Sequence, residues 1–226
     1  MMLRSACCAA WALACVAPSG AVAAADQSEY FVPAGDAPAV PDSDGFVRRW
    51  LVLEPIVKPN RTNQGFTAEY VRRALAAATP EGLGKALPHD GQSVPQGATA
   101  LVWHALDARL FDLKLFNVAQ SLDKPTYGVI FWVTTVIDAD RDIADAHLAA
   151  GSNSASMWWL NGVETAGLYG DRRMVMDDVV SPRVMLHKGR NVLRGAVING
   201  PGLSDFCIRF VDDSGAPIRA FTIVTR

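Results

Sequence analysis

Cysteine is scarce in this sequence, and its distribution argues against a disulfide-stabilised fold. Three of the four cysteines, Cys7, Cys8 and Cys15, lie within the first 15 residues. If that segment is removed, Cys207 is left alone and no internal disulfide can form. A hydrophobic core must then supply the stability, and the roughly 200 remaining residues are enough for one single-domain core.

The chain also lacks an excess of either charge and a long apolar run after its first segment. It carries 21 lysines and arginines against 23 aspartates and glutamates, a formal net charge of -2. Because no basic stripe is present, we predict no nucleic-acid partner. No later segment approaches the ~20 apolar residues of a membrane-spanning helix, so we expect no transmembrane segment after the N-terminal one is cleaved.

Recognisable catalytic and metal-binding motifs are missing as well. There is no G-x-S-x-G elbow, and none of the four histidines has a second histidine or cysteine at zinc-ligand spacing. Alternate carboxylates at Asp138, Asp140 and Asp142 resemble a calcium loop, but Ile143 and Ala149 stand where an EF-hand needs glycine and glutamate. A solvated turn is the more typical meaning of this segment. We predict no catalytic residues, no metal ligands and no cofactor, and leave a structural calcium ion open.

The N-terminal segment has the composition of a signal peptide. Arg4 gives a positive start, residues 5–16 are mostly apolar, and residues 21–25 are small enough for cleavage. We therefore predict a signal peptide over residues 1–25 and an exported protein, periplasmic or extracellular. Cys15 faintly resembles a lipoprotein-processing box without its usual large aliphatic residue, which argues against lipid anchoring but leaves it open.

The remaining chain divides into a lead-in and one domain. Residues 26–44 hold three prolines among acidic and small residues, which is typical of an extended lead-in rather than packed structure. The domain is predicted over residues 45–226. One short helix near its start is indicated by Thr67 as N-cap, by Phe66 as a hydrophobic staple and by apolar residues at helical spacing. Residues 80–97, rich in glycine, proline and polar residues, predict a long irregular loop.

Strands are expected to make up the rest of the domain. The β-branched and aromatic run from Tyr127 to Ile137 is long enough for a central strand buried on both faces. Short apolar stretches then alternate with turn signals such as Asn161-Gly162, a pair that favours a two-residue hairpin because both residues tolerate positive φ. Cys207 falls in such a stretch as a small packed residue. The pattern predicts an all-β fold, a jelly-roll β-sandwich with one short helix near the N-terminus of the mature domain.

Several segments together resemble a known family. Residues Gly151 to Gly162 (GSNSASMWWLNG) are similar to a hairpin motif of galactose-binding-like jelly-roll domains, which are common in secreted bacterial carbohydrate-active proteins. Further similar segments are residues 50–56, 184–193 and 199–215. The resemblance implies the jelly-roll fold and a carbohydrate or glycan partner. Asn153 and Ser154 replace the paired aspartates of the family motif, so a role of those acids does not transfer to this chain.

The adjacent tryptophans Trp158 and Trp159 are candidates for a ligand contact. Alternation along a strand sends one into the core and the other to the opposite face. A half-exposed indole can stack on a sugar ring while polar residues in nearby loops hydrogen-bond to its hydroxyls. The candidate ligand-binding residues are Trp159, Asn153, Asn161, Arg173, Asn199 and Asp205. The competing structural interpretation, with the tryptophans in core packing and the asparagines as turn formers, is the simpler one.

Three functional hypotheses follow from these patterns. The first is a secreted or periplasmic, non-catalytic module that binds carbohydrate, as the resemblance implies. The second is an envelope domain that contacts a protein partner through the loop from Pro80 to Gly97. The third is a carbohydrate-active hydrolase or esterase, for which the sequence offers no supporting motif.

Overall fold

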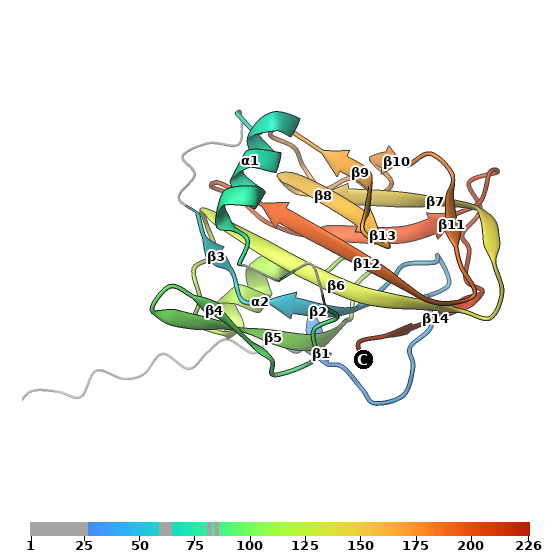
Figure 1. Cartoon of the computed structure of the whole chain (residues 1–226), viewed down its shortest axis with the longest axis horizontal. Coiled ribbons are helices and arrows are strands. Elements are labelled where there is room, and N and C mark those ends of the chain that lie inside the picture. The colour runs from blue at the N-terminus through green and yellow to red at the C-terminus, as the bar shows by residue number, and fades with distance from the viewer. Residues whose placement is uncertain (1–26, 59–64, 81–82, 84–85) are drawn as a thin grey trace, which may run out of the picture.

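Antiparallel strands make up most of the protein, which is described here by a computed structural model (Figure 1). The structure describes residues 27–58, 65–80, 83 and 86–226, so the predicted signal peptide and Cys15 lie outside the described residues. In chain order the elements are β1 (Phe31–Pro33), β2 (Arg49–Leu53), β3 (Ile56–Val57), α1 (Ala68–Ala78), β4 (Ser93–Gln96), β5 (Thr99–Ala108), α2 (Leu115–Ser121), β6 (Val129–Ala139), β7 (Ile143–Ser152), β8 (Ala155–Leu160), β9 (Val163–Leu168), β10 (Val179–Val180), β11 (Val184–Leu186), β12 (Gly189–Ile198), β13 (Phe206–Val211) and β14 (Phe221–Val224).

Strand β6 is the central strand of the larger sheet, as its sequence predicts. The order of this sheet is β1-β5-β2-β6-β12-β8-β9. Strand β12 pairs with β6 along ten residues, from Gly189 opposite Ala139 to Ile198 opposite Ile130. Along the other edge of β6, three short segments follow one another: β14, then β2, then β3. Both edges of the long apolar strand are therefore paired.

A second, smaller sheet packs on one face of the larger sheet. In this sheet β7 pairs with β13 along one edge and with β10 and β11 along the other. Apolar side chains of both sheets form one buried cluster, with Trp50, Phe131, Leu148 and Phe206 among its members. Two antiparallel sheets around a shared core confirm the predicted all-β sandwich.

Helix α1 covers one end of the other face of the larger sheet. Thr67 caps it as predicted, since its side-chain oxygen accepts a hydrogen bond from the Tyr70 backbone N–H at 3.2 Å. Phe66, Val71 and Leu75 are buried in a second apolar cluster together with residues of the larger sheet, including Leu51, Trp103 and Met157. The cluster fixes the helix on the sheet, which is what positions the pocket described below.

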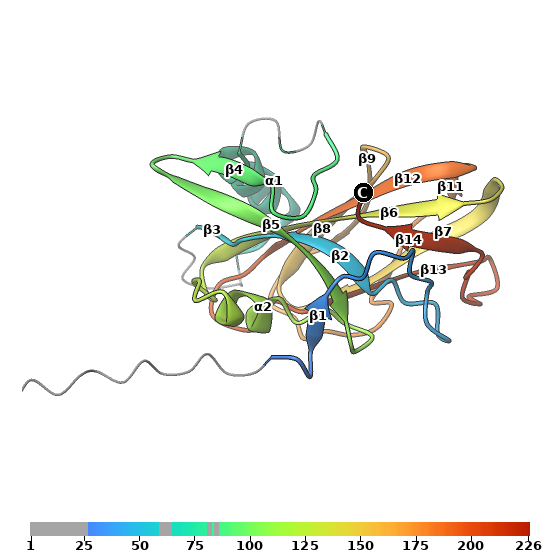
Figure 2. The ribbon, with the colours of Figure 1, turned by 90° about the horizontal axis from the view of Figure 1, so that it is seen from below.

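A second short helix, α2, corrects the expectation of one helix. Figure 2 shows α1 and α2 on opposite sides of strands β2 and β5. Helix α2 has only seven residues and no side-chain hydrogen bond at its N-terminus. Leu115, Val118 and Ala119 belong to the core between the sheets. Burial rather than a capping signal stabilises this helix, so its local sequence carried no strong indication of it.

Two further segments are more ordered than their composition indicates. Within the expected lead-in, β1 pairs with β5 and Ala39 bridges to Ile223, so residues 27–44 pack on the domain instead of standing apart. Within the expected irregular loop, β4 pairs with residues 99–102 of β5. Pro33 and Pro95 are tolerated because their strands lie at sheet edges, where a missing N–H breaks no central ladder.

Candidate functional site

The two adjacent tryptophans of β8 face opposite sides of the larger sheet. Trp158 points into the sandwich, is fully buried, and its ring lies 6.0 Å from that of Trp50 and 5.0 Å from that of Phe206. Gly195, its partner in β12, makes room for the indole, because a Cβ at this position would lie 2.1 Å from the ring. Trp158 Nε1 donates to Ser156 Oγ at 3.0 Å. This tryptophan is therefore a core residue.

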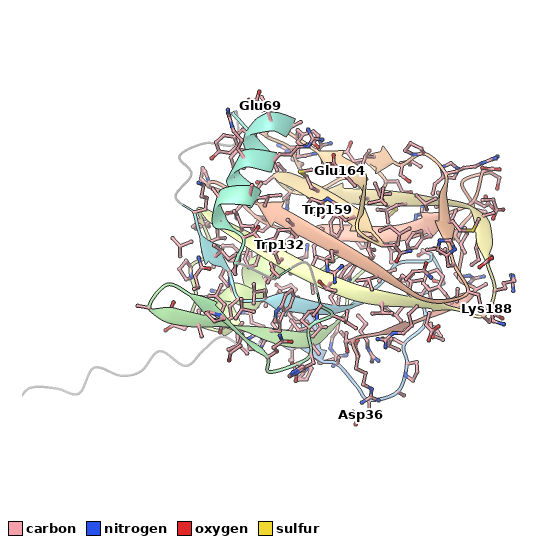
Figure 3. All side chains as sticks on the ribbon, viewed as in Figure 1. Asp36, Glu69, Trp132, Trp159, Glu164 and Lys188 are labelled. Atoms are coloured by element: carbon pink, nitrogen blue, oxygen red, sulfur yellow. The ribbon has the colours of Figure 1, made fainter. Side chains whose placement is uncertain are left out.

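Trp159 lies half-buried on the outer face, beside Trp132 of β6. The two indoles stack with their centroids 5.5 Å apart and their planes at 25°. Figure 3 shows both rings close to α1, which forms the facing wall of an open pocket of ≈ 300 Å³. The residues that line this pocket are Arg72, Leu75, Ala76, Thr79, Trp132, Met157, Trp159 and Glu164. We call it the tryptophan pocket.

An ion pair stands at the rim of the tryptophan pocket. A bulge in β9 places Glu164 opposite Trp159, where its carboxylate accepts two hydrogen bonds from Arg72 of α1. The bond to Glu164 raises the pKa of Arg72. Both side chains are about half exposed, 51% and 40%, so the pair adds little stability. Apolar walls with polar groups at the rim are the usual composition of a small-ligand site.

Three of the predicted site residues, Asn153, Arg173 and Asp205, lie near the other end of β8. The Asn153 backbone N–H donates to the Asp205 carbonyl at 2.8 Å. The Asn153 side-chain oxygen accepts from the Met174 backbone N–H at 2.7 Å and so anchors the loop that carries the exposed Arg173. With roughly 3.3 Å per strand residue, these groups are some 20 Å from Trp159 along the strand.

The two remaining asparagines, Asn161 and Asn199, brace turns. Asn199 is fully buried; its side-chain oxygen accepts from the Val129 N–H at 3.3 Å and its amide donates to the Thr126 carbonyl at 3.1 Å. Asn161 and Gly162 have φ of 51° and 83°, which confirms the predicted two-residue hairpin between β8 and β9. The Asn161 side chain accepts from the Val192 N–H at 2.8 Å. The structure thus does not bring the six predicted residues into one site.

A buried charge cluster involves Asp205 together with two residues that sequence reasoning did not identify. Lys114 Nζ lies 2.7 Å from Asp112 Oδ2 and 3.1 Å from Asp205 Oδ2, and both carboxylates are almost completely buried. Burial raises the pKa of Asp205 against the opposing effect of Lys114. Although burial alone lowers the pKa of Lys114, its bonds to Asp112 and Asp205 raise it overall. The ammonium bridges one oxygen of each carboxylate, which assigns Lys114 a structural role in holding the two buried acids together.

The acidic run at residues 138–142 spans the last two residues of β6 and the three-residue connection to β7. Asp142 accepts a hydrogen bond from the Lys188 backbone N–H at 2.7 Å, and Asp140 lies 3.5 Å from Arg141. Across residues 27–58, 65–80, 83 and 86–226, no three His, Cys, Asp or Glu side chains gather in an arrangement suited to a metal ion. Among those same residues, no helix has the length and apolar character needed to cross a membrane.

Cys207 is buried on the outer side of β13, and we predict that it is chemically unreactive. Burial, followed by the charges of Asp177 and Asp112, raises the pKa of its thiol to about 12. At pH 8 we expect a thiol reagent to modify the folded chain about a thousandfold more slowly than the chain in denaturant, because the thiolate is the reacting form. The measurement is the rate of labelling of protein that lacks residues 1–25, with and without guanidinium. Equal rates would contradict the prediction.

The fold and the tryptophan pocket define an all-β sandwich protein with an aromatic pocket on its larger sheet. No family model matches the sequence, and the curated proteins provide no match either. Among solved structures, the PA14 sugar-binding domain from an RTX adhesin is 11% identical, with a TM-score of 0.44 over 77% of this chain and 96% of that chain. The PA14 domain of the antifreeze protein MpAFP is 9% identical, with a TM-score of 0.41 over 85% of this chain and 94% of that chain. A GH31 alpha-xylosidase from Xanthomonas citri is 7% identical, with a TM-score of 0.29 over 85% of this chain and 19% of that chain. These values are too low to place the chain in a family.

Proposed function

We propose that this chain is a non-catalytic binding module for carbohydrate, and that the tryptophan pocket is its binding site. The observation that carries the proposal is the stacked pair Trp132 and Trp159, half-buried on the outer face of the sandwich. Partly exposed indoles at a concave site suit a ligand with flat apolar faces and polar edges, which is the shape of a sugar ring.

The surroundings of the indoles support the same proposal. Both tryptophans stand on strands of the larger sheet, so their positions are held by backbone pairing rather than by a loop. Arg72 and Glu164 at the rim offer charged donors and acceptors for hydroxyl groups. Export to the periplasm or the cell exterior and a galactose-binding-like jelly roll, both expected from the sequence, belong to this proposal.

The test is retention of the protein on plant, bacterial and algal polysaccharides, followed by calorimetry with oligosaccharides of the polymer that retains it. Trp159→Ala is expected to weaken binding at least about tenfold, because the lost stacking corresponds to 1.4 kcal/mol or more. Tyr127→Ala is the matched control, since Tyr127 is an aromatic residue 55% exposed at a different place on the surface. Failure of the wild type to bind any polymer, or full binding by folded Trp159→Ala, would contradict the proposal.

A further inference from the structure

Arg194, an arginine with no acidic partner among the described residues, lies next to Trp159 in the larger sheet. Strand register places Arg194 of β12 directly opposite Trp159 on one side and Thr134 on the other, so all three share the outer face. Within the described residues, no aspartate or glutamate forms an ion pair with it. Its one hydrogen bond there runs from Nη2 to the Ala86 carbonyl at 3.2 Å.

The donors on this face are incompletely satisfied. Arg194 Nε is buried and has no acceptor among the described residues, and the same is true of the indole N–H of Trp132, two residues along β6 from Thr134. Buried N–H donors are costly to leave without acceptors. Two such donors on one face, next to a pocket, favour binding of a group that accepts hydrogen bonds.

The charges on the outer face also favour an anionic ligand. Arg72 and Glu164 neutralise each other at the rim, whereas the guanidinium of Arg194 has no opposite charge paired with it in the described part of the chain. Burial lowers the pKa of Arg194. A partly desolvated cation of this kind gains more from an anionic ligand than a fully hydrated one.

We propose that the tryptophan pocket binds an acidic sugar, whose ring stacks on the indoles and whose carboxylate pairs with Arg194. This inference rests on the proposed carbohydrate function and adds the chemical class of the ligand, a uronate-containing glycan. A guanidinium presents planar, paired N–H donors that match the two oxygens of a carboxylate. Arg194 and Trp159 are directly opposite each other in the strand register, which places the two groups on neighbouring strands of one face.

The test compares acidic oligosaccharides with neutral ones of the same linkage. Oligogalacturonate, oligomannuronate and their carboxyl-reduced forms are titrated into the protein by calorimetry. We expect an acidic form to bind about 10- to 100-fold more tightly than its reduced counterpart, as for a hydrogen-bonded charge pair. Its affinity should also fall as salt is added. Arg194→Gln should bring the acidic and the reduced form to equal affinity.

Two further variants control the experiment. Arg190 lies on the same strand and face, four residues earlier, is exposed and donates to the Arg226 carbonyl. Arg190→Gln should therefore keep the preference for the acidic form. Arg194→Lys retains the charge without the planar fork and should lower the preference only in part; it also replaces Arg194→Gln if thermal unfolding shows that the glutamine variant is not folded.

The outcomes separate this inference from the proposed function. Equal affinity of the wild type for acidic and reduced oligomers, or binding of neutral polysaccharides alone, would overturn the assignment of Arg194 and leave the carbohydrate proposal standing. An undiminished acidic preference in folded Arg194→Gln would overturn it as well. If the wild type binds no acidic and no neutral carbohydrate, the proposed function itself fails.

Discussion

Trp158→Ala is expected to destabilise the protein by about 3–5 kcal/mol, the usual cost of truncating a fully buried tryptophan. The indole is enclosed by Trp50, Phe206 and the backbone at Gly195, so the sandwich cannot close over the space it leaves. Loss of the indole N–H would also remove one of the two hydrogen bonds of Ser156 Oγ, which keeps the bond to Ser152 Oγ. The measurement is the free energy of unfolding from urea denaturation, followed by tryptophan fluorescence and circular dichroism.

The neighbouring substitution Trp159→Ala is the internal control. Trp159 is half-buried and stacks on Trp132 at the surface of the pocket, so its removal should cost clearly less than that of Trp158. A similar loss of stability for both variants would mean that both indoles are core residues. That result would argue against the tryptophan pocket as a binding site.

Lys114→Met is expected to cost about 3 kcal/mol, near the lower end of the range for a broken buried ion pair, because Lys114 remains 24% exposed. The substitution keeps the apolar stem but leaves Asp112 and Asp205 buried without a cation, and each already has one oxygen with no partner among the described residues. The control is Arg73→Met, which breaks the exposed pair with Glu69 and should cost less than about 0.5 kcal/mol.

The loss in Lys114→Met should depend on pH in a defined direction. Burial already raises the pKa of Asp205 in the folded state, and removal of the ammonium raises it further. The penalty is therefore fully present above the raised folded pKa of Asp205. It shrinks as the pH falls through that pKa toward the unfolded value near 3.8, because the folded state then binds the proton more tightly. A difference from the wild type that stays constant between pH 7 and pH 4 would contradict this account.

Features encoded by local pattern could be predicted from the sequence. The long apolar run of β6, the N-cap of α1 at Thr67 and the hairpin at Asn161-Gly162 depend on residues next to one another in the chain. Alternation also showed that Trp158 and Trp159 face opposite sides. It could not show which side is the interior, because that depends on where the second sheet packs.

Features that depend on distant residues could not be predicted. Trp132 stands in the apolar first half of β6, where no polar alternation marks one face, so no pattern shows that it faces a pocket wall formed by α1. Lys114 and Asp205 are 91 positions apart and meet because the neighbouring residues Leu113 and Phe206 form an isolated β-bridge. The buried position of Asn199 was equally hidden, since an Asn-Gly pair is typical of an exposed turn.

The pairing of β6 also has a consequence for how the chain folds. Its partners β12 and β14 are both synthesised after it, and β14 fills the part of the edge that β2 and β3 leave open. Until both arrive, a long apolar strand presents unpaired N–H and C=O groups, the kind of edge on which chains associate with one another. Because β12 and β14 are distant in sequence and are synthesised after β6, we expect slow folding. Until they pair, covering the edges of β6 in the nascent chain would limit association between chains.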